Sequence, residues 1–198
     1  MPLRARSSLV GWLLAAACVL GATPVAHATS VEAMDLGALV RAADHVVVGT
    51  VVSTEARYDH LDRIVTDATV RVDERMHGAA PEGSTVIVRR LGGVVGDVGL
   101  RIEGEPTFLP GERVLLFART IASERLLRPI GMSQGVMPIQ RDAAGAEVVM
   151  PGGEGLSLVQ RGDDGRLRAA PGALLSPEPA DALLARVRDL VAEVHGGR

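Results

Sequence analysis

Cysteine and aromatic residues are almost missing from this 198-residue chain, which holds one Cys, one Trp, one Tyr and two Phe. Trp12 and Cys18 both lie within the first 28 residues, so the remaining 170 residues contain neither type. A chain without thiols has no disulfides, no thiolate metal site and no cysteine nucleophile. Three aromatic rings are too few to build stacking platforms for sugars, bases or flavins.

Lysine and asparagine are absent altogether, and all 21 basic residues are Arg. Lys and Asn share AT-rich codons, so their joint absence reflects coding bias and carries no chemical information. Residues 29–198 hold 19 Arg against 24 acidic residues, a net charge of −5. A dedicated nucleic-acid binder needs a basic excess, so no nucleic-acid partner is expected.

Residues 1–28 have the organisation of a secretory signal peptide. Two Arg and no acid precede an apolar run from Leu9 to Ala22, and the triplet Ala26-His27-Ala28 forms a small-x-small cleavage site. The run is shorter than the roughly 20 residues of a membrane span, and no later run approaches that length. We therefore expect a periplasmic or secreted protein that begins at Thr29, without a membrane span.

A lipoprotein signal is the alternative for the same segment. Ala15-Ala16-Ala17-Cys18 loosely resembles a lipobox, although the usual Leu three residues before the Cys is missing and apolar sequence continues beyond it. Acylation of Cys18 would make the protein a structural component of the cell envelope.

The remaining sequence predicts a mainly β domain over residues 29–169. Strict alternation from Ile64 to Asp73 is typical of a half-buried strand, and the Val-rich run Val46–Val52, broken by Gly49, indicates a strand buried on both faces or bent at a barrel corner. Further strands are predicted over 85–91, 113–119 and 125–130, followed by hairpins 136–150 and 156–169 with turns at 142–145 and 162–165.

Two helices are predicted to lie on this domain. The first spans Val31 to Ala42, where apolar residues recur at helical spacing. The second is an amphipathic helix over residues 180–195, joined to the domain by a Pro-rich linker, 170–179, in which Ser176 is a candidate cap and Pro177 suits a first turn. The architecture expected from these elements is a small barrel with appended hairpins, covered by the C-terminal helix.

A glycine-dense stretch between residues 92 and 104 is the candidate binding segment. A phosphate-binding loop requires a helix directly after it, whereas Leu100 to Pro106 has no helical face, so the stretch is predicted to be a long, mobile strand connection or a segment wrapped over the barrel mouth. The predicted binding residues are Gly92, Gly93, Gly96, Asp97, Gly99 and Arg101.

Two other patterns suggest chemistry that their context does not favour. Gly131-Met132-Ser133-Gln134-Gly135 matches the Gly-x-Ser-x-Gly spacing of serine hydrolases, yet extended chain follows it where a nucleophile elbow needs a helix. Asp59, His60 and Asp62 crowd one loop and could hold a cation, but turn composition alone accounts for them. No catalytic residue, metal ligand or cofactor is therefore predicted.

Residues 39–117 resemble netrin-like modules, which include the inhibitory domain of tissue inhibitors of metalloproteinases. The resemblance rests on the runs Leu39–Val51, Arg75–Gly78 and Gly111–Phe117. It implies an OB-like five-stranded barrel with a helix before it and extra hairpins after it. Those inhibitors hold the protease zinc through an N-terminal Cys, which this chain lacks, so their mechanism is carried over to no residue here.

The function that follows from these expectations is that of an exported, non-catalytic binding module, such as a partner or inhibitor of an exported protease. A secreted serine hydrolase using Ser133 and a cell-envelope lipoprotein acylated at Cys18 are the alternatives.

Overall fold

The computed structural model describes residues 29–196, apart from 122–125, 154 and 171–175. Strands take up 49 % and helices 17 % of it, which confirms the prediction of a mainly β protein. No helix in these residues combines the length and the apolar character that crossing a membrane requires. The predicted signal peptide and Cys18 lie outside the described residues.

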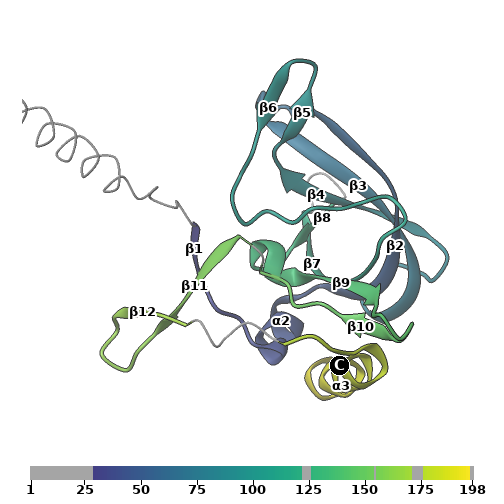
Figure 1. The fold of residues 1–198 in the computed structure, drawn as a ribbon, viewed down its shortest axis with the longest axis vertical. Coiled ribbons are helices and arrows are strands. Elements are labelled where there is room, and N and C mark those ends of the chain that lie inside the picture. The colour runs from purple at the N-terminus through teal and green to yellow at the C-terminus, as the bar shows by residue number, and fades with distance from the viewer. Residues whose placement is uncertain (1–28, 122–125, 154, 171–175, 197–198) are drawn as a thin grey trace, which may run out of the picture.

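The main sheet closes into a ring of five strands, in the order β2-β3-β4-β8-β7 and back to β2 (Figure 1). β2 and β3 are long and antiparallel, and both extend above the ring. β8 closes the ring because it pairs in parallel with β4 and antiparallel with β7. The ring strands are β2 (His45–Tyr58), β3 (Ile64–His77), β4 (Thr85–Leu91), β7 (Arg113–Ile121) and β8 (Leu126–Pro129).

The first half of β2 and most of β7 are buried on both faces, which is one of the two arrangements that the Val-rich run predicted for β2. Val47 and Leu116 belong to a core inside the ring that includes Phe108. Val48 and Phe117 belong to a second core outside the ring, which the helices cover. Gly49 lies at an irregular step of the β2–β3 pairing, and a Cβ there would come within 2.6 Å of the Arg71 carbonyl oxygen. Gly49 therefore allows β3 to approach closely where the strand bends.

Three short strands continue the sheet from the N-terminal half of β7. These are β9 (Val136–Arg141), β10 (Glu147–Val149) and β13 (Glu178–Pro179), and the β9–β10 hairpin turns where the sequence predicted. The second predicted hairpin is formed by β11 (Leu156–Arg161) and β12 (Leu167–Ala169). Together with β1 (Thr29–Glu32), it makes a separate three-stranded sheet that projects from the side of the ring (Figure 1).

Helices α2 (Leu36–Ala42) and α3 (Ala180–His195) cover the outer core below the ring (Figure 1). The buried side of α3 is apolar and includes Leu183, Leu184 and Val187. Glu74 of β3 forms two hydrogen bonds with Arg188 of α3, at 2.7 and 3.0 Å, which ties the exposed side of the helix to the sheet.

The start predicted for the first helix is wrong. Residues Thr29–Glu32 form strand β1, which pairs in parallel with β11, and the helix begins only after Asp35, whose carboxylate accepts the Ala38 N–H. β1 is stabilised by a partner more than 120 residues away in the chain, so its own periodicity could not reveal it.

The capping signals predicted for the last helix are also wrong. α3 begins at Ala180 after Pro179, and no side chain caps it. The two residues before the helix, Glu178 and Pro179, pair with β10 as a short strand, so this part of the predicted linker belongs to the sheet.

Candidate functional site

The glycine-dense stretch begins with a regular β-hairpin, whereas the sequence predicted a long, mobile strand connection or a segment wrapped over the barrel mouth. β5 (Gly93–Val95) and β6 (Val98–Leu100) pair antiparallel around a two-residue turn formed by Gly96 and Asp97. The hairpin stands beside the extended part of β2 and β3, at the end of the molecule opposite the helices (Figure 1).

Gly92 and Gly93 serve the hairpin's attachment to the ring. Both have a positive φ, and a Cβ would come within 2.5 Å of the Leu100 carbonyl oxygen at Gly92 and of the Thr66 hydroxyl at Gly93. The Gly92 N–H donates to the carbonyl of Ile64, and the Thr66 hydroxyl donates to the Gly92 carbonyl at 2.6 Å. These two glycines of the predicted site therefore have a structural role, because only glycine fits so close to Leu100 of β6 at position 92 and to Thr66 of β3 at position 93.

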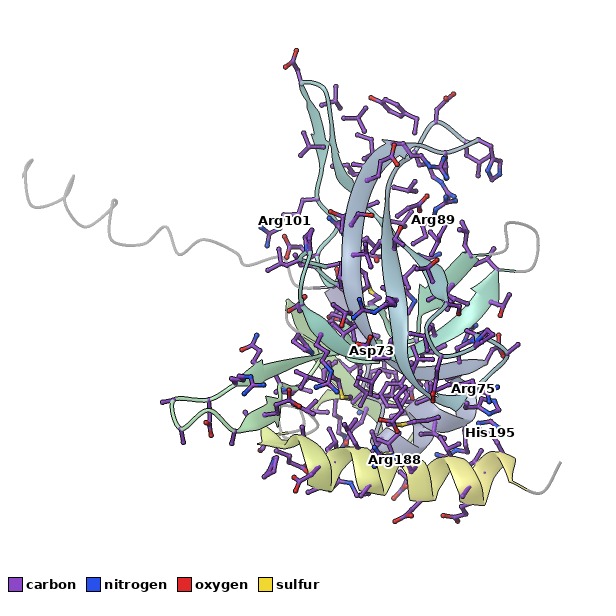
Figure 2. All side chains as sticks on the ribbon, turned by 90° about the vertical axis from the view of Figure 1, so that its right-hand side faces the viewer. Asp73, Arg75, Arg89, Arg101, Arg188 and His195 are labelled. Atoms are coloured by element: carbon purple, nitrogen blue, oxygen red, sulfur yellow. The ribbon has the colours of Figure 1, made fainter. Side chains whose placement is uncertain are left out.

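The other four predicted residues lie on the exposed part of the hairpin or just after it. Gly96 has a φ of 59° with open space around it, as a tight turn requires, and Asp97 next to it is exposed. Gly99 lies at the centre of β6 and is exposed, and a Cβ there would meet only the Val94 side chain, at an ordinary 3.7 Å, and the Gly93 carbonyl. Arg101 follows the strand, with its side chain 86 % exposed and its Nε donating to Glu103 at 2.7 Å (Figure 2).

Exposed apolar side chains are concentrated on this hairpin and on its neighbour, the extended part of β2 with the turn that follows it. Of nine large apolar side chains exposed in the described residues, six lie on these two segments, and Val94 is the most exposed at 68 %. The six are Val52, Tyr58, Leu61, Val94, Val98 and Leu100, hereafter the two-hairpin surface. Clusters of this kind mark interaction surfaces more often than isolated exposed residues do.

Sequence reasoning missed the β2–β3 half of this surface. Tyr58 and Leu61 belong to the loop that was considered only for its polar residues Asp59, His60 and Asp62, although a Tyr and a Leu beside a turn are a recognisable signal of an exposed apolar tip. Their proximity to the β5–β6 hairpin comes from packing: a Cβ on Gly93 would lie 2.9 Å from the Cβ of Ala56, two residues before Tyr58.

The segment after the hairpin anchors itself in the ring. Phe108 is 4 % exposed and belongs to the inner core. Glu105, whose side chain is 4 % exposed, lies 3.5 Å from Arg128 of β8. Burial raises the pKa of the Glu105 carboxyl, although Arg128 and a hydrogen bond from the Leu91 backbone oppose the shift. This segment fixes the base of the hairpin to β4 and β8.

Ser133 lies in a short 3₁₀ helix, Met132–Gly135, and is 6 % exposed. β9 follows at once, so the strand-to-helix context of a nucleophile elbow is missing, as the sequence indicated. Its neighbour Gln134 is 4 % exposed, accepts the Met34 N–H at 2.9 Å and donates to the Glu32 carbonyl at 3.2 Å. The segment thus holds the chain between β1 and α2.

Three histidines gather at the opposite end of the ring. The His77 and His195 rings stack with centroids 3.7 Å apart, and the Nε2 atom of His195 lies 3.1 Å from the Val40 carbonyl oxygen. His45 contacts the Thr120 hydroxyl through its own Nε2, and burial lowers its pKa. Across the described ranges, no group of three or more His, Cys, Asp or Glu has the geometry to hold a metal ion.

The loop that holds Asp59, His60 and Asp62, for which a plain turn was favoured over a cation site, is organised by an ion pair. The Asp59 carboxylate accepts the backbone N–H groups of Leu61 and Arg63 and binds the Arg63 guanidinium at 2.7 Å. The Arg63 hydrogen bond lowers the pKa of Asp59 well below its usual range. Asp59 therefore closes the turn.

The comparisons with known proteins add no identity to this geometry. No protein-family model matches the chain, and no curated protein matches it significantly.

Proposed function

We propose that this protein is an exported, non-catalytic binding module that holds a protein partner with the two-hairpin surface. The observation that supports the proposal is the concentration of exposed apolar side chains on two adjacent hairpins, both rooted in the closed ring. A rigid support with projecting segments suits binding, because little conformational entropy is lost when the partner docks.

The fold and the export that we propose for this protein are consistent with that role. We propose that the ring is an OB-like barrel of the netrin-like kind, with β9–β10 and β11–β12 as the appended hairpins and 1–28 as a signal peptide. An exported protease is the proposed partner class, held by shape and apolar contact. The N-terminal Cys mechanism of the metalloproteinase inhibitors has no counterpart at Thr29.

Site-specific photo-cross-linking tests the proposal. A photoreactive residue at Val94, 68 % exposed, is compared with one at Leu167, which is 56 % exposed on the β12 hairpin. Incubation with the native periplasmic or culture fluid should give a discrete protein adduct from position 94 and none from position 167. The same pattern of adducts from both positions, or none from position 94, would reject the two-hairpin surface as a binding site.

A charge on the same surface gives an independent measurement. The Val94→Glu variant should no longer capture the partner that cross-linking identifies, because binding would bury a carboxylate without a counter-charge. Leu167→Glu is the matched control and should leave capture unchanged. If a protease is captured, its activity with and without the protein tells a partner from an inhibitor.

A further inference from the structure

The outer strand of the β5–β6 hairpin has one edge without a strand partner in the described part of the chain. β6 pairs with β5 alone, and β5 is the strand of the hairpin that packs against β2 and β3. Such an edge offers backbone N–H and C=O groups to another strand. Native proteins protect such edges by keeping them short, with charged side chains or with Pro. β6 is short, but it carries no charge and no Pro between Val98 and Leu100.

The sequence of this edge is complementary to itself. When two copies of β6 are laid antiparallel about Gly99, each residue faces one that lies equally far on the other side of that glycine. Asp97 then faces Arg101 of the second copy, and Val98 faces Leu100 of the second copy. Every charge on the edge meets an opposite charge, and every apolar side chain meets an apolar one.

The backbone direction of β6 agrees with this register. Val95 and Val98 are ladder partners on either side of the two-residue turn, so the amide groups of Val98 are directed toward β5. Amide groups alternate in direction along a strand, and those of Gly99 therefore point to the open side. Two Gly99 residues facing each other would exchange both of their hydrogen bonds.

The side chains involved are available for this contact. Asp97 is exposed and has no hydrogen-bond or ion-pair partner among the described residues. Arg101 uses its Nε on Glu103, whereas its Nη2 lies 3.5 Å from the same carboxylate, and the side chain is 86 % exposed. The guanidinium has five N–H donors, so it can hold Glu103 and a second carboxylate together.

We propose that two copies of this protein associate through antiparallel pairing of their β6 edges about Gly99, with Asp97 of each copy against Arg101 of the other. The product is a four-stranded β5-β6-β6-β5 ribbon with two-fold symmetry, in which each copy contributes the same residues to the interface. The proposal does not depend on the proposed function, because the pairing needs no other protein.

Charge exchange tests the register. Asp97→Arg makes both cross-copy pairs repulsive, and so does Arg101→Asp, so each variant alone should dimerise at least about tenfold more weakly than the wild type. An equimolar mixture of the two variants restores opposite charges in both pairs and should form a heterodimer. Sedimentation velocity over a concentration series measures all of these species.

Matched controls come from the turn of the β11–β12 hairpin, where Asp163 and Arg166 are both exposed. Asp163→Arg and Arg166→Asp should leave the wild-type association unchanged. A wild-type protein that is still monomeric at about 1 mM would overturn the proposal. So would a dimer that both β6 variants retain, or a mixture of the variants that stays monomeric while each keeps its wild-type circular dichroism.

Discussion

Replacing Gln134 with Leu should loosen the N-terminal strand from the rest of the molecule. The amide of Gln134 accepts the Met34 N–H at 2.9 Å and donates to the carbonyls of Glu32 and Gly131, each at 3.2 Å. Leu is close to Gln in size and makes none of these bonds. We therefore expect the fold to survive, with the segment between β1 and α2 held only by its remaining backbone bonds, such as that from the Ala33 N–H to the Val159 carbonyl.

The magnitude follows from the three lost bonds. A net contribution of about 1 kcal/mol for each hydrogen bond predicts a loss of about 2–3 kcal/mol in the free energy of unfolding, part of it offset by the apolar side chain. For a domain of this size, 1 kcal/mol shifts the Tm by roughly 2–4 °C, so the Tm should fall by about 4–12 °C.

Urea unfolding followed by circular dichroism measures the loss, and hydrogen exchange locates it. The Ala33 N–H, which donates to the Val159 carbonyl at 2.8 Å, should exchange faster in the variant. Gln160→Leu, on the exposed part of β11, is the control and should change stability by no more than about 0.5 kcal/mol. A Gln134→Leu protein as stable as that control, with unchanged exchange at Ala33, would refute the role given to this amide.

Two further predictions concern the base of the hairpin. Gly93→Ala should destabilise the protein clearly more than Gly96→Ala, because a methyl group at Gly93 would collide with the Thr66 hydroxyl whereas Gly96 has open space and only its φ of 59° to oppose the change; equal urea midpoints for the two variants would contradict this. Glu105→Gln should gain stability relative to the wild type as the pH rises from 4 to 7. A carboxyl with a raised pKa in the folded state contributes stability that is fully present below its unfolded pKa and is lost as the pH rises through the folded pKa. A stability difference between the variant and the wild type that does not change with pH would show that burial does not dominate at this carboxyl.

The prediction of strands succeeded where burial leaves a pattern in the strand's own sequence, with one face buried or with both faces buried. Ile64 to Asp73 alternates because one face of β3 lies in the ring core, and Val46 to Val48 are consecutive apolar residues because both faces of β2 are covered there. Both patterns are local in the sequence. The turns of the β9–β10 and β11–β12 hairpins were predictable for the same reason, since Gly and Asp supply the turn conformation on their own.

The candidate site was located only in part. Glycine density drew attention to residues 92–101. It could not distinguish Gly92 and Gly93, which allow close approach to neighbouring strands, from Gly96, which forms a turn. That distinction depends on atoms of Ile64, Thr66 and Leu100, which are brought close only by folding.

By itself, the sequence determined the mainly β class, the amphipathic face of α3, and the absence of thiol chemistry from residues 29–198, because composition and periodicity act on each segment separately. Tertiary structure alone decided that Thr29–Glu32 is a strand, that Glu178 and Pro179 extend the sheet, and that Tyr58 and Val94 share one end of the molecule. Each of these depends on a partner distant in the chain, and pairing between distant segments leaves little trace in either segment's own pattern.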